Sequence, residues 1–336
     1  MNDFHIQWHI TDRCNLRCLH CYQDSFEGSC ELNWENLKEI CDNLIKSMQA
    51  LNKRLTISLT GGEPFLKDEL FSIIDYLSAS EYVSELNIIT NAILVDKYIS
   101  KLKGFPKLKN IYVSLEGTTP LVNDSIRGNG TFRKVLSNLE LLKDNDFSVF
   151  IMFTLLKSNL GEVERLLDFC RKNGLSGFIL ERFIPLGQSK KIKQGLVSSS
   201  QLQGVYKIIF EQCGLDFFEE AVKYHALKVE VEEGKADLFG AECVVGRYGC
   251  AVLPDGGVLP CRRFNLKIGS LFQASLADIF NNSPVLKKAR LKESLQGYCR
   301  DCKIEGCLGC RALAFAVSGY YTLSDPLCWI RKAGVT

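Results

Sequence analysis

The sequence predicts an α/β fold: an open, partial TIM-like (β/α)6 barrel followed by a small, loop-rich and cysteine-rich domain. Two observations carry this prediction. Short β-rich runs alternate with amphipathic helical patterns up to about residue 182, and cysteines then gather beyond residue 241. Such alternation implies parallel strands joined by right-handed crossovers. Six strands are too few for the usual eight-stranded barrel, and the active site is expected at the carboxyl ends of the strands.

The predicted elements follow from residue type and period. Runs rich in β-branched and aromatic residues predict strands at 4–10, 54–59, 85–90, 110–115, 148–155 and 177–182. Amphipathic segments predict helices at 34–50, 68–79, 131–144 and 160–173. The first helix has a clear start, with Asn33 as its N-cap and Leu37, Ile40 and Leu44 on one apolar face.

The second half of the chain changes character. Residues 188–235 are expected to be largely helical, with Ser198–Ser200 capping the first helix. The helical period ends near 236–242, and the sequence then becomes rich in Cys, Gly and turns. A loop-rich region of this kind needs cross-links, which metal-bound thiolates provide. We therefore expect a barrel over 1–187, a helical bridge over 188–240 and a cysteine-rich domain over 241–336.

Composition excludes several classes of protein. The formal charge is +2 and the charges are interspersed, so there is no electrostatic footprint for nucleic acid. No apolar run approaches the ~20 residues needed to cross a bilayer. The start "MNDFHIQWHI" is too polar for a secretory signal, so we expect a cytoplasmic protein without membrane or nucleic-acid partners. Fifteen cysteines in a reducing compartment favour metal or redox chemistry over disulfides.

Three of these cysteines, Cys14, Cys18 and Cys21, directly follow the first predicted strand in "TDRCNLRCLHCYQD". One interpretation is a zinc site with His20 as the fourth ligand. The other is an iron–sulfur cubane held by three thiolates, which leaves the fourth iron open to a chelating ligand. The second interpretation explains why there are three cysteines instead of four.

The CxxxCxxC pattern, followed by "TGGEP" at the end of the second predicted strand, resembles the signature of radical S-adenosylmethionine (radical SAM) enzymes. The resemblance implies a [4Fe–4S] cluster whose open iron is chelated by the methionine amino and carboxylate groups of SAM. Glycines without side chains would let backbone carbonyls approach the ammonium group closely. Further along, "TNA", "SLEG" and "RFIPLG" resemble the segments of this family that face the ribose and adenine.

The SAM contacts implied by this resemblance come from the ends of several strands. They are His20, Gly61, Gly62, Glu63, Pro64, Asn91, Ser114, Glu116 and Pro185. Within this set, Glu63 would orient the ammonium group and Glu116 stands where the family has Asp. His20 would stack on adenine.

Eight further cysteines lie between residues 243 and 328, enough for two four-coordinate sites. Alone, "CRDCKIEGCLGC" is also typical of a zinc ribbon. The whole set resembles the SPASM extension of radical SAM enzymes, although the two later gaps are each one residue shorter here. The resemblance implies two auxiliary [4Fe–4S] clusters, one bound by Cys243, Cys250, Cys261 and Cys310 and the other by Cys299, Cys302, Cys307 and Cys328. Asp255–Gly257 is expected to reverse a hairpin between two of these cysteines.

The resemblance implies three [4Fe–4S] clusters, SAM as cofactor and a 5′-deoxyadenosyl radical that abstracts hydrogen from a substrate. The expected substrate is a peptide, brought by a separate leader-binding protein, with flavodoxin or ferredoxin as reductant and an anaerobic host. Two alternatives remain open: a porphyrin propionate decarboxylase and a non-catalytic, zinc-stapled binding protein.

One position bears on the choice of substrate. In sulfatase-maturing relatives, an Asp that acts as a base directly follows the third SPASM cysteine. Here Arg262 stands in that place, followed by Arg263. This departure argues against formylglycine formation and makes Arg262 a candidate for binding a substrate carboxylate. No catalytic acid or base is assigned.

Overall fold

The computed structural model describes residues 3–330. Its strands form one 11-stranded sheet. The strand order is β11-β10-β9-β1-β2-β3-β4-β5-β6-β7-β8. The strands are β1 (Asp3–His9), β2 (Arg54–Thr60), β3 (Val83–Thr90), β4 (Leu108–Ser114), β5 (Ser148–Leu155), β6 (Gly177–Arg182), β7 (Ala226–Glu232), β8 (Lys235–Ala241), β9 (Gly249–Val252), β10 (Gly257–Leu259) and β11 (Gly269–Ser270). Neighbours from β1 to β6 are all parallel, which confirms the partial barrel.

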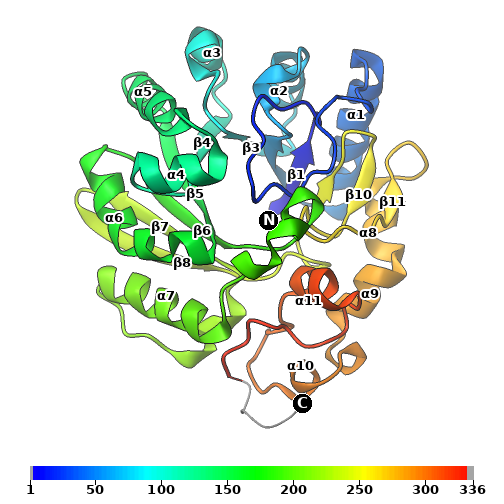
Figure 1. Cartoon of the computed structure of the whole chain (residues 1–336). Coiled ribbons are helices and arrows are strands. Elements are labelled where there is room, and N and C mark those ends of the chain that lie inside the picture. The colour runs from blue at the N-terminus through cyan, green and yellow to red at the C-terminus, as the bar shows by residue number, and fades with distance from the viewer. Residues whose placement is uncertain (1–2, 331–336) are drawn as a thin grey trace.

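The helices cover the outer face of the curved sheet, and the last of them form a separate lower part of the molecule (Figure 1). They are α1 (Trp34–Leu51), α2 (Leu70–Ser78), α3 (Val95–Leu102), α4 (Pro120–Arg127), α5 (Thr131–Lys143), α6 (Val163–Lys172), α7 (Ser199–Gln212), α8 (Leu276–Asn282), α9 (Pro284–Arg290), α10 (Tyr298–Asp301) and α11 (Arg311–Ser318). None of the helices within residues 3–330 is long and apolar enough to span a bilayer.

The residues of β1 show that one face of the sheet packs in the apolar core and the other faces the candidate site. Phe4, Ile6 and Trp8 are fully buried, and Phe4 meets Phe280 of α8 edge to face at 4.9 Å between ring centroids. The alternate residues face the other way, and Gln7 lines the cavity described below. The apolar core therefore lies between the sheet and its helices, which leaves the concave face for polar groups.

All six predicted barrel strands are confirmed to within two residues at each end. The four predicted helices correspond to α1, α2, α5 and α6, and the Asn33 side chain accepts a hydrogen bond from the backbone N–H of Asn36 at 3.0 Å, as an N-cap does. Two short helices, α3 and α4, were not predicted, because each spans only eight residues. Such a length gives the apolar period little room to show.

The prediction of a largely helical segment over 188–235 is wrong in its second half. Only α7 is a regular α-helix there, and β7 forms an antiparallel hairpin with β8 beside β6. The sequence "ALKVEVE" alternates, with Leu227 and Val229 buried and Lys228 and Glu230 partly exposed. That period of two is a strand signal, and the hairpin covers the edge of β6 that would otherwise remain unpaired.

The chain beyond residue 241 returns to the barrel. Strand β9 pairs in parallel with β1, and β9 and β10 form the predicted hairpin, in which Asp255 accepts a hydrogen bond from the backbone N–H of Gly257 at 2.9 Å. Helices α9, α10 and α11 then form the lower, orange-to-red part of Figure 1. The predicted bridge thus contributes β7 and β8 to the barrel sheet, and the cysteine-rich segment extends the other edge of that sheet.

Candidate functional site

The three N-terminal thiols lie on the loop that follows β1, at the carboxyl edge of the parallel strands. Cys14, Cys18 and Cys21 line the same cavity, which has a volume of about 140 Å³. Burial raises the pKa of all three thiols, that of Cys14 to about 11, and repulsion from neighbouring thiolates adds to this effect at Cys14 and Cys21. Three thiolates so placed need a cationic group to stabilise them, and soft sulfur donors fit an iron–sulfur cluster.

The cysteine loop is fixed against the end of β2 by backbone contacts. Gly62 N–H donates to the Thr11 carbonyl and Glu63 N–H to the Arg13 carbonyl, both at 2.8 Å. A Cβ atom on Gly61 would lie 2.6 Å from the Thr11 oxygen, and one on Gly62 would lie 2.4 Å from the Arg13 oxygen. The structure thus gives these glycines a role beyond the predicted approach to a cofactor, because no larger residue allows this docking.

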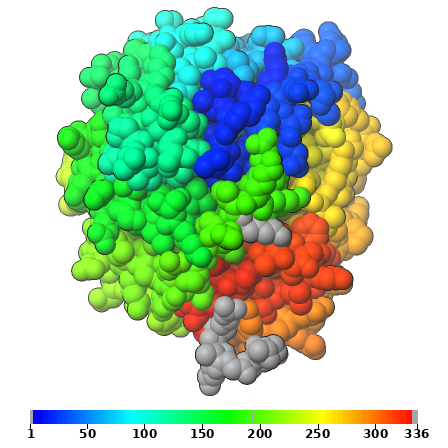
Figure 2. All heavy atoms as spheres, in the orientation of Figure 1, coloured from blue at the N-terminus to red at the C-terminus, as the bar shows by residue number. Residues whose placement is uncertain are grey.

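A second segment holds the loop from the other side. Gly187–Gly195 (η3) follows β6, and there Gln188 N–H donates to the Gln23 carbonyl at 3.1 Å and Ser189 N–H to the Cys21 carbonyl at 3.0 Å. Figure 2 shows this green segment lying against the dark-blue N-terminal loop on the surface. The three-thiol loop is therefore positioned by elements from both ends of the barrel sequence.

Glu63 joins the ends of two neighbouring strands. Its buried carboxyl accepts hydrogen bonds from Thr90 Oγ1 at 2.7 Å, Asn91 N–H at 2.8 Å and Phe65 N–H at 3.3 Å. Burial outweighs these bonds and raises the pKa of Glu63 to about 7. Pro64 begins the short 3₁₀-helix η1 (Pro64–Leu66) that leads the chain away from the site.

Replacing Glu63 by Gln is expected to change how stability depends on pH. Between its unfolded pKa of 4.5 and its folded pKa of about 7, Glu63 binds more protons in the folded state, so its contribution to stability falls as pH rises. The wild type should lose on the order of 3 kcal/mol from this group between pH 4.5 and 7. The measurement is the free energy of unfolding from urea denaturation at several pH values across this range. It should fall less steeply with pH in Glu63→Gln than in the wild type, and equal slopes would contradict the prediction.

A triad of Glu116, Arg127 and His20 forms another part of the cavity lining. Glu116 Oε1 lies 3.2 Å from His20 Nε2, and Glu116 Oε2 accepts a hydrogen bond from Arg127 Nη1 at 2.7 Å. Burial alone would raise the pKa of Glu116, but Arg127 and His20 together lower it to about 2. Both Arg127 Nε and His20 Nδ1 are buried without a hydrogen-bond partner. The triad thus leaves two polar atoms for a bound group.

Arg127 was missed by the sequence analysis. It lies at the last position of α4, a helix that was not predicted, and it is 6% exposed. The available signal was Thr119 followed by Pro120, since a capping residue followed by proline often begins a helix.

Some of the predicted SAM contacts line the cavity and others do not. His20, Gly61, Gly62, Asn91, Ser114 and Glu116 line the cavity with the three thiols, whereas Glu63, Pro64 and Pro185 do not. Asn91 lies close to the thiol loop, because its Nδ2 donates to Asn15 Oδ1 at 2.8 Å and lies 3.9 Å from Cys14 Sγ. Next to Pro185, Phe183 and Ile184 line the cavity instead.

Arg263, which follows the predicted contact Arg262, adds a charged group to the lining of the cavity, and its carboxylate partner Glu181 was not predicted. Arg263 Nη2 pairs with Glu181 Oε1 at 3.1 Å, and Arg263 Nη1 donates to the Arg182 carbonyl at 3.1 Å. The buried Arg182 pairs with Asp325 at 3.1 Å, which ties β6 to the C-terminal part. Sequence patterns do not connect Glu181 with Arg263, because Glu181 is on β6 and Arg263 is in the turn after β10, about 80 residues further along the chain.

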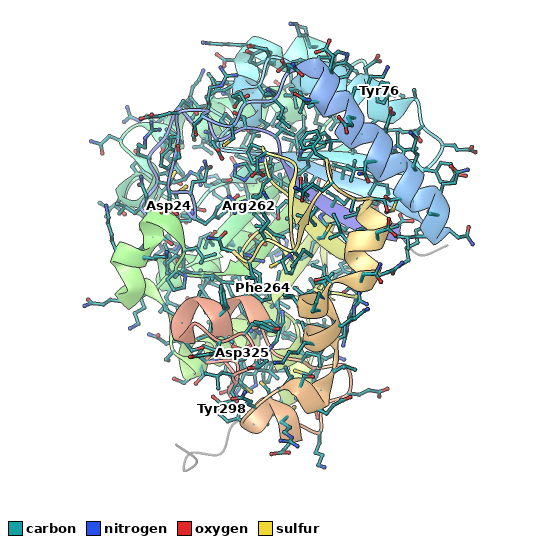
Figure 3. All side chains as sticks on the ribbon, turned by 90° about the vertical axis from the view of Figure 1, so that its right-hand side faces the viewer. Asp24, Tyr76, Arg262, Phe264, Tyr298 and Asp325 are labelled. Atoms are coloured by element: carbon teal, nitrogen blue, oxygen red, sulfur yellow. The ribbon has the colours of Figure 1, made fainter. Side chains whose placement is uncertain are left out.

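Arg262, the predicted substrate contact, does not line this cavity. Its Nε donates to Nδ1 of the fully buried His9 at 2.7 Å, and its guanidinium lies 4.3 Å from the centre of the Tyr22 ring. Figure 3 shows Arg262 between the barrel and the lower part that contains Phe264 and Asp325. Of the two neighbouring arginines, Arg263 is therefore the one that reaches the cavity.

The structure brings together three of the four thiols predicted for the first auxiliary cluster. Burial raises the pKa of Cys243 to about 12, and the thiols of Cys310 and Cys261 add to the effect. Cys250 lies apart from these three: it is on β9, in register with Ile6 of β1, and burial alone raises its pKa to about 12. Strand alternation places its side chain in the apolar core beside Ile6.

All four thiols predicted for the second auxiliary cluster lie together. Cys299, Cys302, Cys307 and Cys328 line one cavity of about 810 Å³. Burial raises the pKa of Cys307 to about 11, and the other three thiols contribute to the rise. Within residues 3–330, no three His, Cys, Asp or Glu side chains lie close enough to hold a single metal ion.

Comparison with known families gives two matches along the chain. The model of the radical SAM superfamily matches residues 8–170, and that of SPASM, an iron–sulfur cluster-binding domain, matches residues 243–303. The first match contains the three-thiol loop and the second begins at Cys243. SAM binding and [4Fe–4S] clusters follow from the two families.

The chain is similar to several proteins over nearly its whole length. It is 26% identical to an AdoMet-dependent heme synthase of Methanosarcina barkeri, over 97% of this chain and 96% of that protein. It is 27% identical to the subtilosin biosynthesis protein AlbA of Bacillus subtilis, over 90% and 67% respectively. The crystal structure of Streptococcus suis SuiB with its precursor peptide SuiA has the same fold, with a TM-score of 0.71 at 17% identity over 98% and 76% of the two chains. The protein is a member of the radical SAM enzyme superfamily and has a C-terminal SPASM domain.

Proposed function

We propose that the protein modifies a peptide, with SAM bound at the three-thiol end of the cavity and the substrate between this end and Glu181 and Arg263. When bound, the N-terminal cluster and SAM supply the one-electron reductive cleavage that yields a 5′-deoxyadenosyl radical. Cys14, Cys18 and Cys21 hold that cluster in this proposal. Asn91, Ser114 and the triad of His20, Glu116 and Arg127 orient the cofactor from the strand ends.

The observation that carries the choice of substrate is the charge balance of the cavity wall. Among the described residues that line it, each guanidinium has a carboxylate partner: Arg127 with Glu116, Arg182 with Asp325 and Arg263 with Glu181. A porphyrin with several propionates would meet compensated arginines and the carboxylates beside them. An amide group suits such a wall better, since it offers a carbonyl to Arg263 and an N–H to Glu181.

Relatives named for peptide chemistry agree with this choice, and others favour a second candidate. AlbA is named for bacteriocin biosynthesis and SuiB was solved with a precursor peptide. The heme synthase of Methanosarcina barkeri matches this chain and its own length almost completely, and it favours decarboxylation of a porphyrin propionate. The zinc-stapled binding protein is set aside, because both matching families are iron–sulfur families.

The proposal includes two auxiliary clusters and two partners. Two sets of thiols would hold the clusters, and the clusters would supply one-electron transfer. The first set is Cys243, Cys261 and Cys310, and the second is Cys299, Cys302, Cys307 and Cys328. A separate leader-binding protein would deliver the peptide, and flavodoxin or ferredoxin would supply the reducing electron.

Anaerobic assays with two substrate classes test the proposal. The reconstituted protein is incubated with SAM, dithionite and either an iron porphyrin that carries propionates or any short peptide that a neighbouring gene encodes. We expect a peptide to stimulate 5′-deoxyadenosine release and to lose hydrogen in its mass spectrum. Decarboxylation of the porphyrin, with no change in any peptide, would contradict the proposal.

Substitutions at the two neighbouring arginines provide the matched comparison. Arg263→Ala should reduce peptide modification and leave uncoupled SAM cleavage intact, because Arg263 lines the cavity but is neither one of the three thiols nor one of the proposed SAM contacts. Arg262→Ala should affect modification less, since its side chain lies against His9 and Tyr22. An equal loss in both variants would argue against Arg263 as a substrate contact.

A further inference from the structure

The first auxiliary site has three thiols where a four-iron cube calls for four ligands. Besides burial, the thiols of Cys310 and Cys261 raise the pKa of Cys243, and that of Cys310 raises the pKa of Cys261. Cys250 lies on β9, in register with Ile6 in the apolar core. The remaining four late thiols line the separate cavity of the second set. A different side chain is therefore needed if the protein itself completes the first set.

His225 is placed next to this set by the β7–β8 hairpin. Its backbone N–H donates to the Ala241 carbonyl at 2.7 Å, two residues before Cys243. Its Nε2 is shielded from solvent and has no hydrogen-bond partner. A buried imidazole nitrogen without a hydrogen-bond partner costs free energy of folding. This atom is therefore available to bind a ligand.

The environment of His225 is shared with the three thiols. Besides burial, the pKa of His225 is shifted by four nearby charged groups: Arg182, Asp325, Arg263 and Arg311. The pKa of Cys310 is also shifted by the first three of these groups, and that of Cys243 by Arg311. Contacts tie the same groups to the thiols, because Asp325 accepts a hydrogen bond from the Cys310 N–H at 2.8 Å.

The other histidines of the chain are committed elsewhere. There are four in total. His5 Nδ1 is hydrogen-bonded to Thr56, His9 accepts from Arg262, and His20 pairs with Glu116 beside the N-terminal thiols. This distribution leaves His225 as the histidine associated with the auxiliary thiols.

We propose that Nε2 of His225 is the fourth protein ligand of the first auxiliary cluster, with Cys243, Cys261 and Cys310. A neutral imidazole in place of a thiolate makes a cluster less negative, and such a change raises its reduction potential. The first auxiliary cluster would then accept an electron more readily than its all-cysteine neighbour. The inference rests on the presence of the cluster and is independent of the substrate.

Pulsed electron paramagnetic resonance tests this ligand directly. In a variant with Cys14, Cys18 and Cys21 all changed to Ala, the N-terminal cluster and its neighbouring His20 no longer contribute. The reduced auxiliary clusters should show the strong nitrogen coupling of a bound imidazole, and the coupling should change when histidine carries the heavy nitrogen isotope. Absence of histidine coupling in this protein would overturn the proposal.

Two variants of His225 and two cysteine variants identify the residue. His225→Ala should lose the nitrogen coupling, and His225→Cys should retain the iron content and shift one auxiliary potential to a more negative value. Cys250→Ser should keep the iron content and the spectrum, while Cys243→Ala should lose a cluster. Coupling that persists in His225→Ala, or loss of a cluster in Cys250→Ser, would contradict the assignment. These readouts do not depend on turnover, so the proposed function can fail without affecting them.

Discussion

A Cys18→Ala variant is expected to lose reductive SAM cleavage by more than about 100-fold, since even residues that only orient metal ligands cost 10–100-fold when they are changed. Cys18 lines the cavity between the other two thiols of its loop, near Arg127 and Glu116. Its removal leaves two thiolates, which do not hold a cube with one open iron. Release of 5′-deoxyadenosine with dithionite is the measurement, together with a loss of about four irons per chain.

Two cysteine variants serve as controls. Cys30→Ala removes an exposed thiol that does not line the cavity, and it should leave both cleavage and iron content unchanged. Cys307→Ala removes a thiol of the second auxiliary set, so it should retain cleavage and lose the modified product. If Cys18→Ala still cleaves SAM at the wild-type rate, the N-terminal loop does not hold the reactive cluster.

The barrel was predictable because its signals are local. Each of β1 to β6 is a short apolar run, and the alternating order of strands and helices determines parallel pairing. The hairpin of β7 and β8 was misread because residues 188–235 were taken together as one largely helical segment, and the short alternating run of β7 was not separated from it. The pairing of β9 with β1 was missed for a different reason: it joins residues separated by most of the chain, and a four-residue strand does not reveal its partner.

The thiols of the site were predictable, and their charged partners were not. Spacing alone grouped Cys14, Cys18 and Cys21, and the structure places them around one cavity. The eight late cysteines were divided into two sets of four, the first with Cys250, and the structure places Cys250 on β9 in register with the buried Ile6. The pair of Glu181 and Arg263 was missed because it depends on the meeting of β6 with the cysteine-rich segment.

Replacing Asp325 by Ala is expected to destabilise the protein by about 3–5 kcal/mol, because it leaves a buried arginine without its counter-charge. Arg182 and Asp325 are each 1% exposed and lie 3.1 Å apart. The same carboxylate accepts hydrogen bonds from the backbone N–H groups of Cys310 at 2.8 Å and Leu327 at 2.9 Å. The free energy of unfolding from anaerobic urea denaturation is the measurement.

A surface pair of the same chemistry isolates the effect of burial. Asp96 pairs with Lys134 at 2.8 Å, but both side chains are about 40% exposed, so Asp96→Ala should cost less than about 1 kcal/mol. Asp325→Asn should fall between the two alanine variants, because it removes the charge and retains one carbonyl acceptor for the backbone. The Cys310 N–H links this carboxylate to the first auxiliary set, and the Asp325 N–H lies 3.3 Å from Cys299 Sγ of the second. The Asp325→Ala variant should therefore also lose iron, and equal costs for Asp325→Ala and Asp96→Ala would show that Arg182 does not depend on this partner.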